Sequence, residues 1–285
     1  MKYILITGTN SGIGEKTCEF LLKKGYHVFG SVRDKKNAET LKAKLGENFT
    51  PLVFDITDEI AISKAVSLVK TQLGQEGLSA LINNAGIVIS GALKELATAD
   101  FKKQLDVNLV GTFMVTKAFL PLLGADKSSS IKPGRIINIS SLSGIRTFPF
   151  LGAYSISKHG MEALTDGLRR ELLLYGIDVI GILPGSVNTP LIGKMESGIT
   201  QASKFSDYAT MLVKFKELNE AKVKQGVPIE KVVNTILQAI ENPKPKARYY
   251  LRTSFLTDFL LPTLLPTRLF DKIIASKLGI KNEKK

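Results

Sequence analysis

The chain has 285 residues, of which 44% are hydrophobic and 23% charged, and its 39 Lys and Arg outnumber 26 Asp and Glu to give a formal net charge of +13. This composition is typical of a globular protein and excludes a disordered or collagen-like chain. One cysteine, Cys18, excludes a disulfide framework or a cysteine-rich zinc site, and two histidines, His27 and His159, argue against a histidine-based one, so we expect no metal. The basic excess indicates an anionic partner: nucleic acid, a phosphate-bearing cofactor and an anionic membrane surface all fit.

The N-terminus predicts a cytoplasmic protein. Its apolar run Ile4–Ile6 ends at Thr7-Gly8, and it is shorter than a signal-peptide core of roughly 7–15 residues. Because no uninterrupted run of about 18 apolar residues occurs, we expect no membrane-spanning helix.

The first part of the chain alternates short apolar runs with amphipathic segments, which is the pattern of repeated βα units. Such units form a parallel sheet with helices on both faces, and strands buried on both faces are nearly all apolar. The expected fold class is therefore α/β, with a doubly wound parallel sheet. We predict strands at Lys2–Thr7, His27–Val32, Pro51–Asp55, Leu78–Asn83, Arg135–Ser140 and Ile177–Leu183, and helices at Gly12–Lys24, Lys35–Leu45, Asp58–Leu73, Asp100–Leu123 and Ala153–Tyr175.

The alternation changes after Pro184. Residues 186–227 contain no clear strand and are expected to form a helical or loop insertion. A helix at Pro228–Glu241 and a last strand at Arg248–Leu251 follow. The end, Phe255–Ile280, is rich in Leu and Phe and is broken by two prolines. We therefore expect one domain over residues 1–250, with the insertion at 186–227, and a basic, apolar extension over 251–285.

A glycine-rich turn, Thr7–Gly14, joins the first strand to the first helix. Glycines let backbone N–H groups approach a pyrophosphate at the positive end of a helix. The spacing G-x-x-x-G-x-G differs from the common G-x-G-x-x-G, so an ordinary glycine turn is the alternative.

The second strand ends in Val32-Arg33-Asp34. Val32 cannot hydrogen-bond the hydroxyls of a ribose, whereas the guanidinium of Arg33 suits a 2′-phosphate. This favours NADP(H) over NAD(H). In the alternative, Arg33 is solvated and Asp34 faces the ribose.

A tyrosine and a lysine share one face of a predicted helix. Tyr154 and Lys158 are four residues apart, so the phenol and the ammonium can point into one cleft. A nearby cation stabilises tyrosinate and lowers its pKa, which would let Tyr154 exchange a proton with a hydroxyl or carbonyl oxygen. Taken alone, such a pair is more often two surface side chains of an amphipathic helix, because tyrosine and lysine commonly occur at this spacing by chance. Ser141, however, follows the fifth strand, where ligand-facing residues lie in an open α/β sheet.

In combination, these segments make the sequence resemble the short-chain dehydrogenase/reductase family over roughly residues 1–250. The resemblance implies a Rossmann-like fold and an NAD(P)-dependent oxidoreductase. The matching segments, in the order and spacing of the family, are Thr7–Gly14, Asp55, Asn83–Gly86, Asn108, Ser141, Tyr154, Lys158 and Pro184–Thr189.

The resemblance also implies a role for each matching residue. Tyr154 would be the proton donor or acceptor, Lys158 would hold the nicotinamide ribose and lower the pKa of Tyr154, and Ser141 would bind the reacting oxygen. Ser140 is an alternative catalytic serine, but the spacing favours Ser141. Asn108 would support a water in a proton relay to Lys158. The implied cofactor-binding residues are Gly8, Thr9, Asn10, Ser11, Gly12, Ile13, Gly14, Arg33, Asp55, Ile56, Asn83, Ala85, Gly86, Tyr154, Lys158, Pro184, Gly185, Val187 and Thr189.

The substrate pocket is expected between Ser143–Leu151, residues 188–226 and the C-terminal extension. Because Phe148–Leu151 and the extension are apolar, we expect a lipophilic carbonyl or alcohol such as a retinoid, a steroid or a long-chain aldehyde or ketone. Here the chain resembles the retinol and hydroxysteroid dehydrogenase branch. Alternatively, these residues pack on the core or on a partner subunit. An NADPH cofactor would favour carbonyl reduction.

Residues 242–285 hold ten Lys or Arg and three Asp or Glu, and so carry +7 of the net charge. Mixed basic and apolar residues suit peripheral contact with an anionic membrane, and the alternative is a solvated lid packed on its own subunit. The resemblance also implies a homodimer or homotetramer formed through the two long helices.

An NADP(H)-dependent oxidoreductase is favoured over a catalytically idle NADP-binding sensor or scaffold because Ser141, Tyr154 and Lys158 are all present. Nucleic acid is not an expected partner, since no nucleic-acid motif accompanies the charge.

Overall fold

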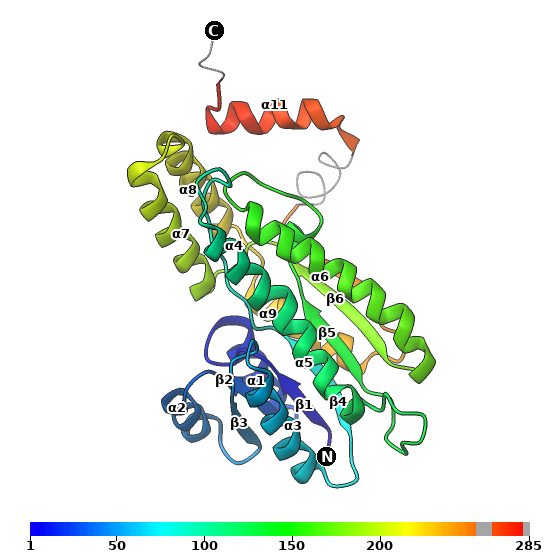
Figure 1. The fold of residues 1–285 in the computed structure, drawn as a ribbon. Helices are drawn as coiled ribbons and strands as arrows, with labels where there is room; N and C mark the ends of the chain where they lie inside the picture. The colour runs from blue at the N-terminus through cyan, green and yellow to red at the C-terminus, as the bar shows by residue number, and fades with distance from the viewer. Residues whose placement is uncertain (255–263, 282–285) are drawn as a thin grey trace.

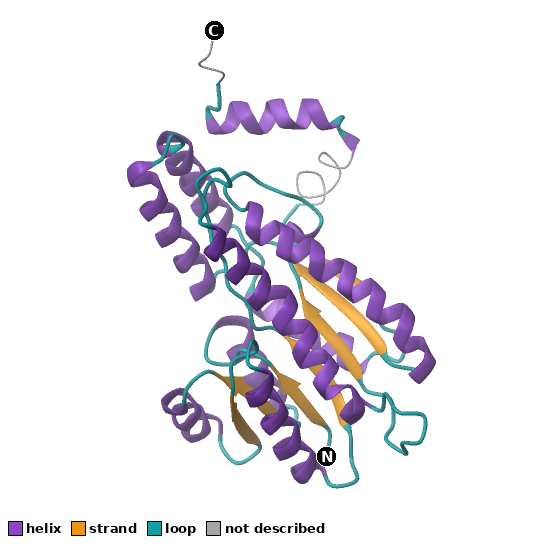
Figure 2. Cartoon of the chain, viewed as in Figure 1, coloured by secondary structure: helices purple, strands orange, loops and turns teal. Residues whose placement is uncertain are grey.

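A computed structural model describes residues 1–254 and 264–281 of the chain, and a seven-stranded sheet lies at its centre (Figures 1 and 2). The strand order is β3-β2-β1-β4-β5-β6-β7, and every neighbouring pair is parallel. This confirms the predicted doubly wound α/β fold. The strands are β1 (Tyr3–Ile6), β2 (His27–Val32), β3 (Phe49–Val53), β4 (Leu78–Asn83), β5 (Arg135–Ile139), β6 (Asp178–Pro184) and β7 (Arg248–Leu251).

Helices cover both faces of the sheet. One face packs against α1 (Gly12–Lys23), α2 (Lys35–Leu45) and α9 (Ile229–Glu241). The other packs against α3 (Glu59–Leu73), α5 (Thr112–Phe119) and α6 (Gly152–Glu171), which is followed by the 3₁₀ turn η4 (Leu172–Tyr175).

The central strand β1 shows how one apolar run serves both layers. Its fully buried side chains alternate, so that Ile4 and Ile6 pack toward α1 and α9, while Leu5 packs toward α3 and α5. Side chains that point to opposite faces in turn require an apolar residue at every position. The chain order reverses between β1 and its neighbour β4, and ligands bind in such sheets beside the carboxyl ends of the strands at this reversal.

Strand β3 begins and ends two residues before the predicted Pro51–Asp55. Pro51 lies inside the strand, paired with Gly30 of β2. Because β3 is the edge strand, the missing N–H of proline costs no ladder hydrogen bond on its free side. Asp55 consequently lies in the loop beyond the strand, at the carboxyl edge of the sheet.

The helix predicted at Asp100–Leu123 is divided into four segments. They are α4 (Thr98–Leu105), the wide π-helical turn η1 (Asp106–Gly111), α5 and the 3₁₀ turn η2 (Leu120–Leu123). The whole stretch Thr98–Leu123 is long and apolar enough to span a membrane by length and composition alone. Its residues Val115 and Phe119 are fully buried against the sheet, as in the core helix of a folded domain.

The insertion predicted at 186–227 as helical or loop is helical. It consists of α7 (Pro190–Ala202), the short turn η5 (Ser203–Phe205) and α8 (Ala209–Lys224), and it leads into α9. Figure 1 shows α7 and α8 side by side at one end of the molecule, with α11 (Thr267–Leu278) across that end. Leu278 packs with Phe150, Met195, Leu212 and other side chains in a small separate core. The predicted apolar residues at 255–263 lie outside the described residues.

Candidate active site

The glycine turn between β1 and α1 is built for close backbone approach. Gly8 and Gly12 both have positive φ, +71° and +60°, which favours glycine over other residues. A Cβ at Gly14 would collide with the carbonyl oxygen of Gly8. The turn therefore leaves its backbone and the positive N-terminus of α1 free of side chains, as a pyrophosphate site requires.

Asn84 fixes this turn from the neighbouring strand. Its Nδ2 donates to the carbonyl oxygens of Thr7 (3.0 Å) and Gly8 (2.9 Å), and Thr7 Oγ1 accepts from the backbone N–H groups of Asn84 and Ala85. Ser31 supports it from β2, since its Oγ accepts from the N–H of Gly8 at 3.0 Å. Sequence reasoning had assigned no role to Asn84 or Ser31.

Asn83, in contrast, was expected in the cofactor cleft and does not line it. This side chain is 3% exposed, and its Nδ2 donates to Thr116 Oγ1 (2.8 Å) and Asn138 Oδ1 (2.9 Å). As the last residue of β4, Asn83 faces the helix layer, whereas Asn84 lies just beyond the strand. Successive residues of a strand point to opposite sides. Asn84, the next residue after Asn83, therefore lines the cavity, and Asn83 does not.

The end of β2 separates Arg33 from Asp34. Arg33 is exposed and lines the cavity described below. Asp34 is the N-cap of α2, where one carboxylate oxygen accepts from the N–H of Asn37 at 2.8 Å and the other from Asn37 Nδ2. Because the Asp34 carboxylate is used as a cap, the alternative in which it faces a ribose loses support.

Tyr154 and Lys158 lie on one face of α6 and meet Ser141 at the carboxyl end of β5. Lys158 Nζ lies 5.8 Å from the centre of the Tyr154 ring and donates to the carbonyl oxygen of Ile139 at 2.8 Å. Burial raises the pKa of Tyr154, and a hydrogen bond with the Ser141 hydroxyl opposes that shift. Ser141 Oγ also accepts from the N–H of Ser143 at 3.1 Å. These contacts hold the three polar side chains together.

Asn108 lies in the wide turn η1 and is fully buried. Its Oδ1 accepts from the N–H of Ile87 (2.8 Å), and its Nδ2 donates to the carbonyl oxygen of Ile87 and to Ser157 Oγ, each at 3.0 Å. Ser157 in turn donates to the carbonyl oxygen of Tyr154 at 2.7 Å. Asn108 thus connects the loop after β4 to the first turns of α6, and it does not line the cavity described next.

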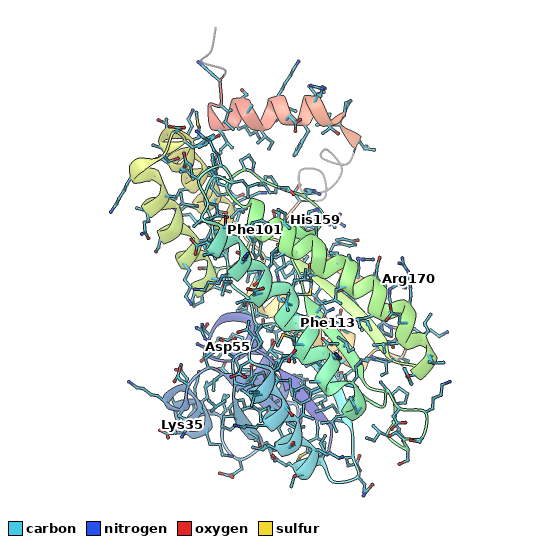
Figure 3. The ribbon with its side chains drawn as sticks, in the orientation of Figure 1. Lys35, Asp55, Phe101, Phe113, His159 and Arg170 are labelled. Carbon is cyan, nitrogen blue, oxygen red and sulfur yellow. The ribbon has the colours of Figure 1, made fainter. Side chains whose placement is uncertain are left out.

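A cavity of about 1030 Å³ brings most of the predicted site together. Four of the predicted residues do not line the cavity: Thr9, Gly14, Asn83 and Asn108. The side chain of Thr9 is fully buried and donates to the carbonyl oxygen of Ser31. Asp55, labelled in Figure 3, lines the cavity from the loop after β3. Those that line it are Gly8, Asn10, Ser11, Gly12, Ile13, Arg33, Asp55, Ile56, Ala85, Gly86, Ser141, Tyr154, Lys158, Pro184, Gly185, Val187 and Thr189.

Burial lowers the pKa of Lys158 from 10.5 to about 8, and the nearby carboxylate of Glu162 opposes this shift. Because the folded pKa is depressed, the unfolded chain binds more protons between about pH 8 and pH 10.5, and stability rises with pH across that window. We therefore expect the thermal midpoint of the wild type to rise, relative to that of Lys158→Met, between about pH 7 and about pH 9. Differential scanning calorimetry measures this difference.

The exposed Lys231 on α9 provides the control. Lys231→Met removes one ammonium group that does not line the cavity, and it should keep the pH dependence of the wild type. Equal pH dependence for the wild type and Lys158→Met would contradict the predicted shift.

Comparison with known proteins agrees with this geometry. Residues 2–199 match the sequence model of the family described as short chain dehydrogenase, so the chain belongs to the short-chain dehydrogenases. It is 40% identical over 278 residues, 98% of each chain, to the NADPH-dependent 3-dehydrocapnine reductase of Ornithobacterium rhinotracheale. It is 37% identical over 214 residues to retinol dehydrogenase 7 of Rattus norvegicus, covering 75% of this chain and 65% of that protein.

Solved structures show the same fold. A variant of actinorhodin polyketide ketoreductase with NADPH superposes with a TM-score of 0.74 at 28% identity, covering 88% of this chain and 94% of that chain. A short-chain dehydrogenase from Streptomyces avermitilis gives a TM-score of 0.74 at 26% identity, with 96% and 94% covered.

Proposed function

We propose that this protein is an NADP(H)-dependent oxidoreductase that reduces a lipophilic ketone or aldehyde to an alcohol. The observation that carries the proposal is the placement of Ser141, Tyr154 and Lys158 on the wall of a cavity that also reaches the glycine turn. A cofactor bound along that wall would have its nicotinamide end beside a proton donor.

The residues of the cofactor half fit NADP(H). Three observations support this choice: the open backbone of the glycine turn suits a pyrophosphate, the guanidinium of Arg33 at the end of β2 suits a 2′-phosphate, and Asp34 is engaged as a helix cap. The named cofactor of two similar proteins, the 3-dehydrocapnine reductase and the polyketide ketoreductase, supports the same choice.

Each polar residue then has one task. NADPH, when bound, supplies the hydride. The Tyr154 hydroxyl donates a proton to the carbonyl oxygen as that oxygen becomes an alkoxide, and Ser141 donates a hydrogen bond to the same oxygen. The ammonium of Lys158 lowers the cost of forming tyrosinate in a buried site. Asn108 holds Ser157 and thereby the start of α6, the position from which it would support a proton relay to Lys158.

The substrate half of the cavity supports a lipophilic substrate. Apolar side chains reach it from the loop before α6 and from α8, α7 and α11; they include Phe148, Leu151, Met195, Phe215, Leu218, Ile274 and Leu278. Burial of each methylene contributes about 0.8 kcal/mol, which is about a fourfold change in an equilibrium constant.

We therefore expect kcat/KM for 2-alkanones to rise by up to about fourfold per methylene added within the cavity. The loss of NADPH fluorescence measures turnover, and fructose serves as a polar six-carbon control for 2-hexanone. Faster turnover of fructose than of 2-hexanone would contradict a lipophilic substrate.

The protein is further proposed to be a cytoplasmic homodimer or homotetramer. Exposed apolar side chains on η1, α5 and α6 support this assembly: Val110, Phe113 and Ile156 are each 43–45% exposed, and Phe113 is labelled on α5 in Figure 3. Peripheral membrane contact through the extension is supported by exposed Leu264 and Leu269 beside the exposed bases Arg268 and Lys272.

A further inference from the structure

A second buried charge lies one helical turn beyond Lys158 on α6. Glu162 follows Lys158 by four residues, so the two side chains lie on one face of the helix. Both are nearly fully buried, since Lys158 is 5% exposed and Glu162 is 7% exposed. A buried ion is costly unless an opposite charge or hydrogen bonds compensate it, so the surroundings of Glu162 indicate what its charge does.

One oxygen of the Glu162 carboxylate is bound from the edge of the sheet. Arg248, on β7, donates from Nε to Glu162 Oε2 and from Nη2 to Asp166 Oδ1, each at 2.7 Å. In the sheet, Arg248 is paired with Gly181 of β6, and a Cβ at Gly181 would touch both Arg248 and Glu162. The ion pair therefore holds Glu162 from a separate element and leaves the other carboxylate oxygen uncommitted.

That second oxygen, Oε1, is buried and has no hydrogen-bond partner within residues 1–254 and 264–281. Most buried polar side-chain atoms are hydrogen-bonded, so this one calls for an explanation. The turn η3 (Leu142–Gly144) packs directly on this part of α6, because a Cβ at Gly144 would lie within 3.0 Å of the carbonyl oxygen of Lys158 and of Glu162 Cγ. Protein atoms thus enclose Lys158 and Glu162 together, where water screens their attraction only weakly.

Other charges on the elements packed against α6 do not take the place of Glu162. The charged and titratable side chains on these elements are Asp100, Lys102, Lys103 and Asp106 on α4 and η1, Arg135 on β5, Asp178 on β6 and Tyr175 on η4. Those of α4 and η1 are exposed, and those of β5 and β6 lie at the amino ends of the strands, whereas the site lies at the carboxyl ends. Tyr154 and Arg146 line the same cavity as Lys158. Burial lowers the pKa of Lys158, and the carboxylate of Glu162 opposes that shift.

From this arrangement we propose that Glu162 is a positioning residue for Lys158: its carboxylate keeps the buried ammonium protonated, and Arg248 holds that carboxylate in place. The effect on turnover rests on the proposed function, in which the ammonium assists the formation of tyrosinate at Tyr154. Without the carboxylate, Lys158 becomes a neutral amine over part of the pH range in which the wild type carries a cation.

Carbon-13 NMR of the full chain, labelled at lysine Cε, tests this inference without cofactor or turnover. Lys158→Met identifies the resonance of Lys158, and a pH titration gives its midpoint. We expect Glu162→Gln to lower this midpoint by about half to one pH unit, because the amide has the same shape but no charge. Glu162→Asp, which keeps the charge on a shorter side chain, should give an intermediate midpoint, and it carries the test if Glu162→Gln does not fold.

Asp166→Asn is the matched control. Asp166 is the other carboxylate that Arg248 binds, and it lies one turn further along α6. Its neutralisation weakens the same ion-pair cluster but should leave the Lys158 midpoint unchanged. If the cluster were merely structural, both variants would lower the thermal midpoint of unfolding and neither would move the Lys158 titration.

An unchanged Lys158 midpoint in Glu162→Gln would overturn the inference, as would an equal shift in Asp166→Asn. Turnover separates this failure from a failure of the proposed function. With NADPH and 2-octanone, the alkaline limb of kcat/KM should move to lower pH in Glu162→Gln, and a limb that stays in place although the titration shifts would also contradict the role of Glu162. If NADPH is oxidised while the titration is unchanged, the reductase assignment stands and the role of Glu162 is wrong. A shifted titration with no oxidation of NADPH by the wild type would support the link between Glu162 and Lys158 and contradict the reductase assignment.

Discussion

Tyr154→Phe should lose about 10²- to 10⁴-fold in kcat, because it removes the hydroxyl that we propose transfers a proton to the substrate oxygen. Phenylalanine has nearly the same shape, so the fold of α6 and the cofactor half of the cavity should be unchanged. The rate of NADPH consumption with a long-chain 2-alkanone measures the loss, and NADPH fluorescence titration should give an unaltered dissociation constant.

Tyr175→Phe is the matched control. Tyr175 ends the turn η4 at the far end of the same helical segment and packs at the edge of the core. Its variant should turn over like the wild type. If Tyr154→Phe also kept wild-type kcat, the proton would have to come from another group, and the proposed mechanism would be wrong.

Arg33→Ala should change the choice of cofactor. A hydrogen bond to a charged group contributes about 1.5–3 kcal/mol, which corresponds to roughly ten- to a hundredfold in affinity. Because Arg33 is exposed and water and salt screen it, we expect the lower end, a rise of about tenfold in KM for NADPH. KM for NADH, which has no 2′-phosphate, should stay nearly constant.

Lys35→Ala controls for a general loss of positive charge. Lys35 begins α2 two residues further on, is exposed (Figure 3), and does not line the cavity. It should leave both KM values unchanged. A parallel rise in KM for NADPH and NADH on substitution of Arg33 would show that Arg33 does not read the 2′-phosphate.

The sequence was most informative where local chemistry determines structure. The strand–glycine–helix passage at Thr7–Gly14 and the pair Tyr154 and Lys158 were placed correctly because positive φ and helical spacing are properties of a few consecutive residues. The position of Asn83 outside the cavity has a different origin. Which of two adjacent asparagines lines the cavity depends on where β4 ends, and that is determined by its partners β1 and β5.

Long-range contacts explain what could not be predicted. The wide turn at Asp106–Gly111 has the same apolar pattern as an ordinary helix, and its last residue, Gly111, packs so closely on Ile56 that a Cβ there would press on it. Lys194, Lys222 and Lys277 line the same cavity although they are far apart in the sequence, and only the packing of α7, α8 and α11 around the cavity relates them. The boundary of β3 was also missed because an edge position makes Pro51 acceptable.

The wide turn η1 has a consequence for how this chain can vary in length. Gln104 and Asn108, on either side of its start, hold the extended segment Ile87–Ile89 through both of their amides. Val115 and Phe119 follow on α5 and fill the core. Deleting one residue between these pairs would restore regular helical hydrogen bonds but rotate α5 by about 100°. The number of residues in η1 therefore sets the angle, measured about the helix axis, between two pairs of side chains. Gln104 and Asn108 support the site, and Val115 and Phe119 fill the core.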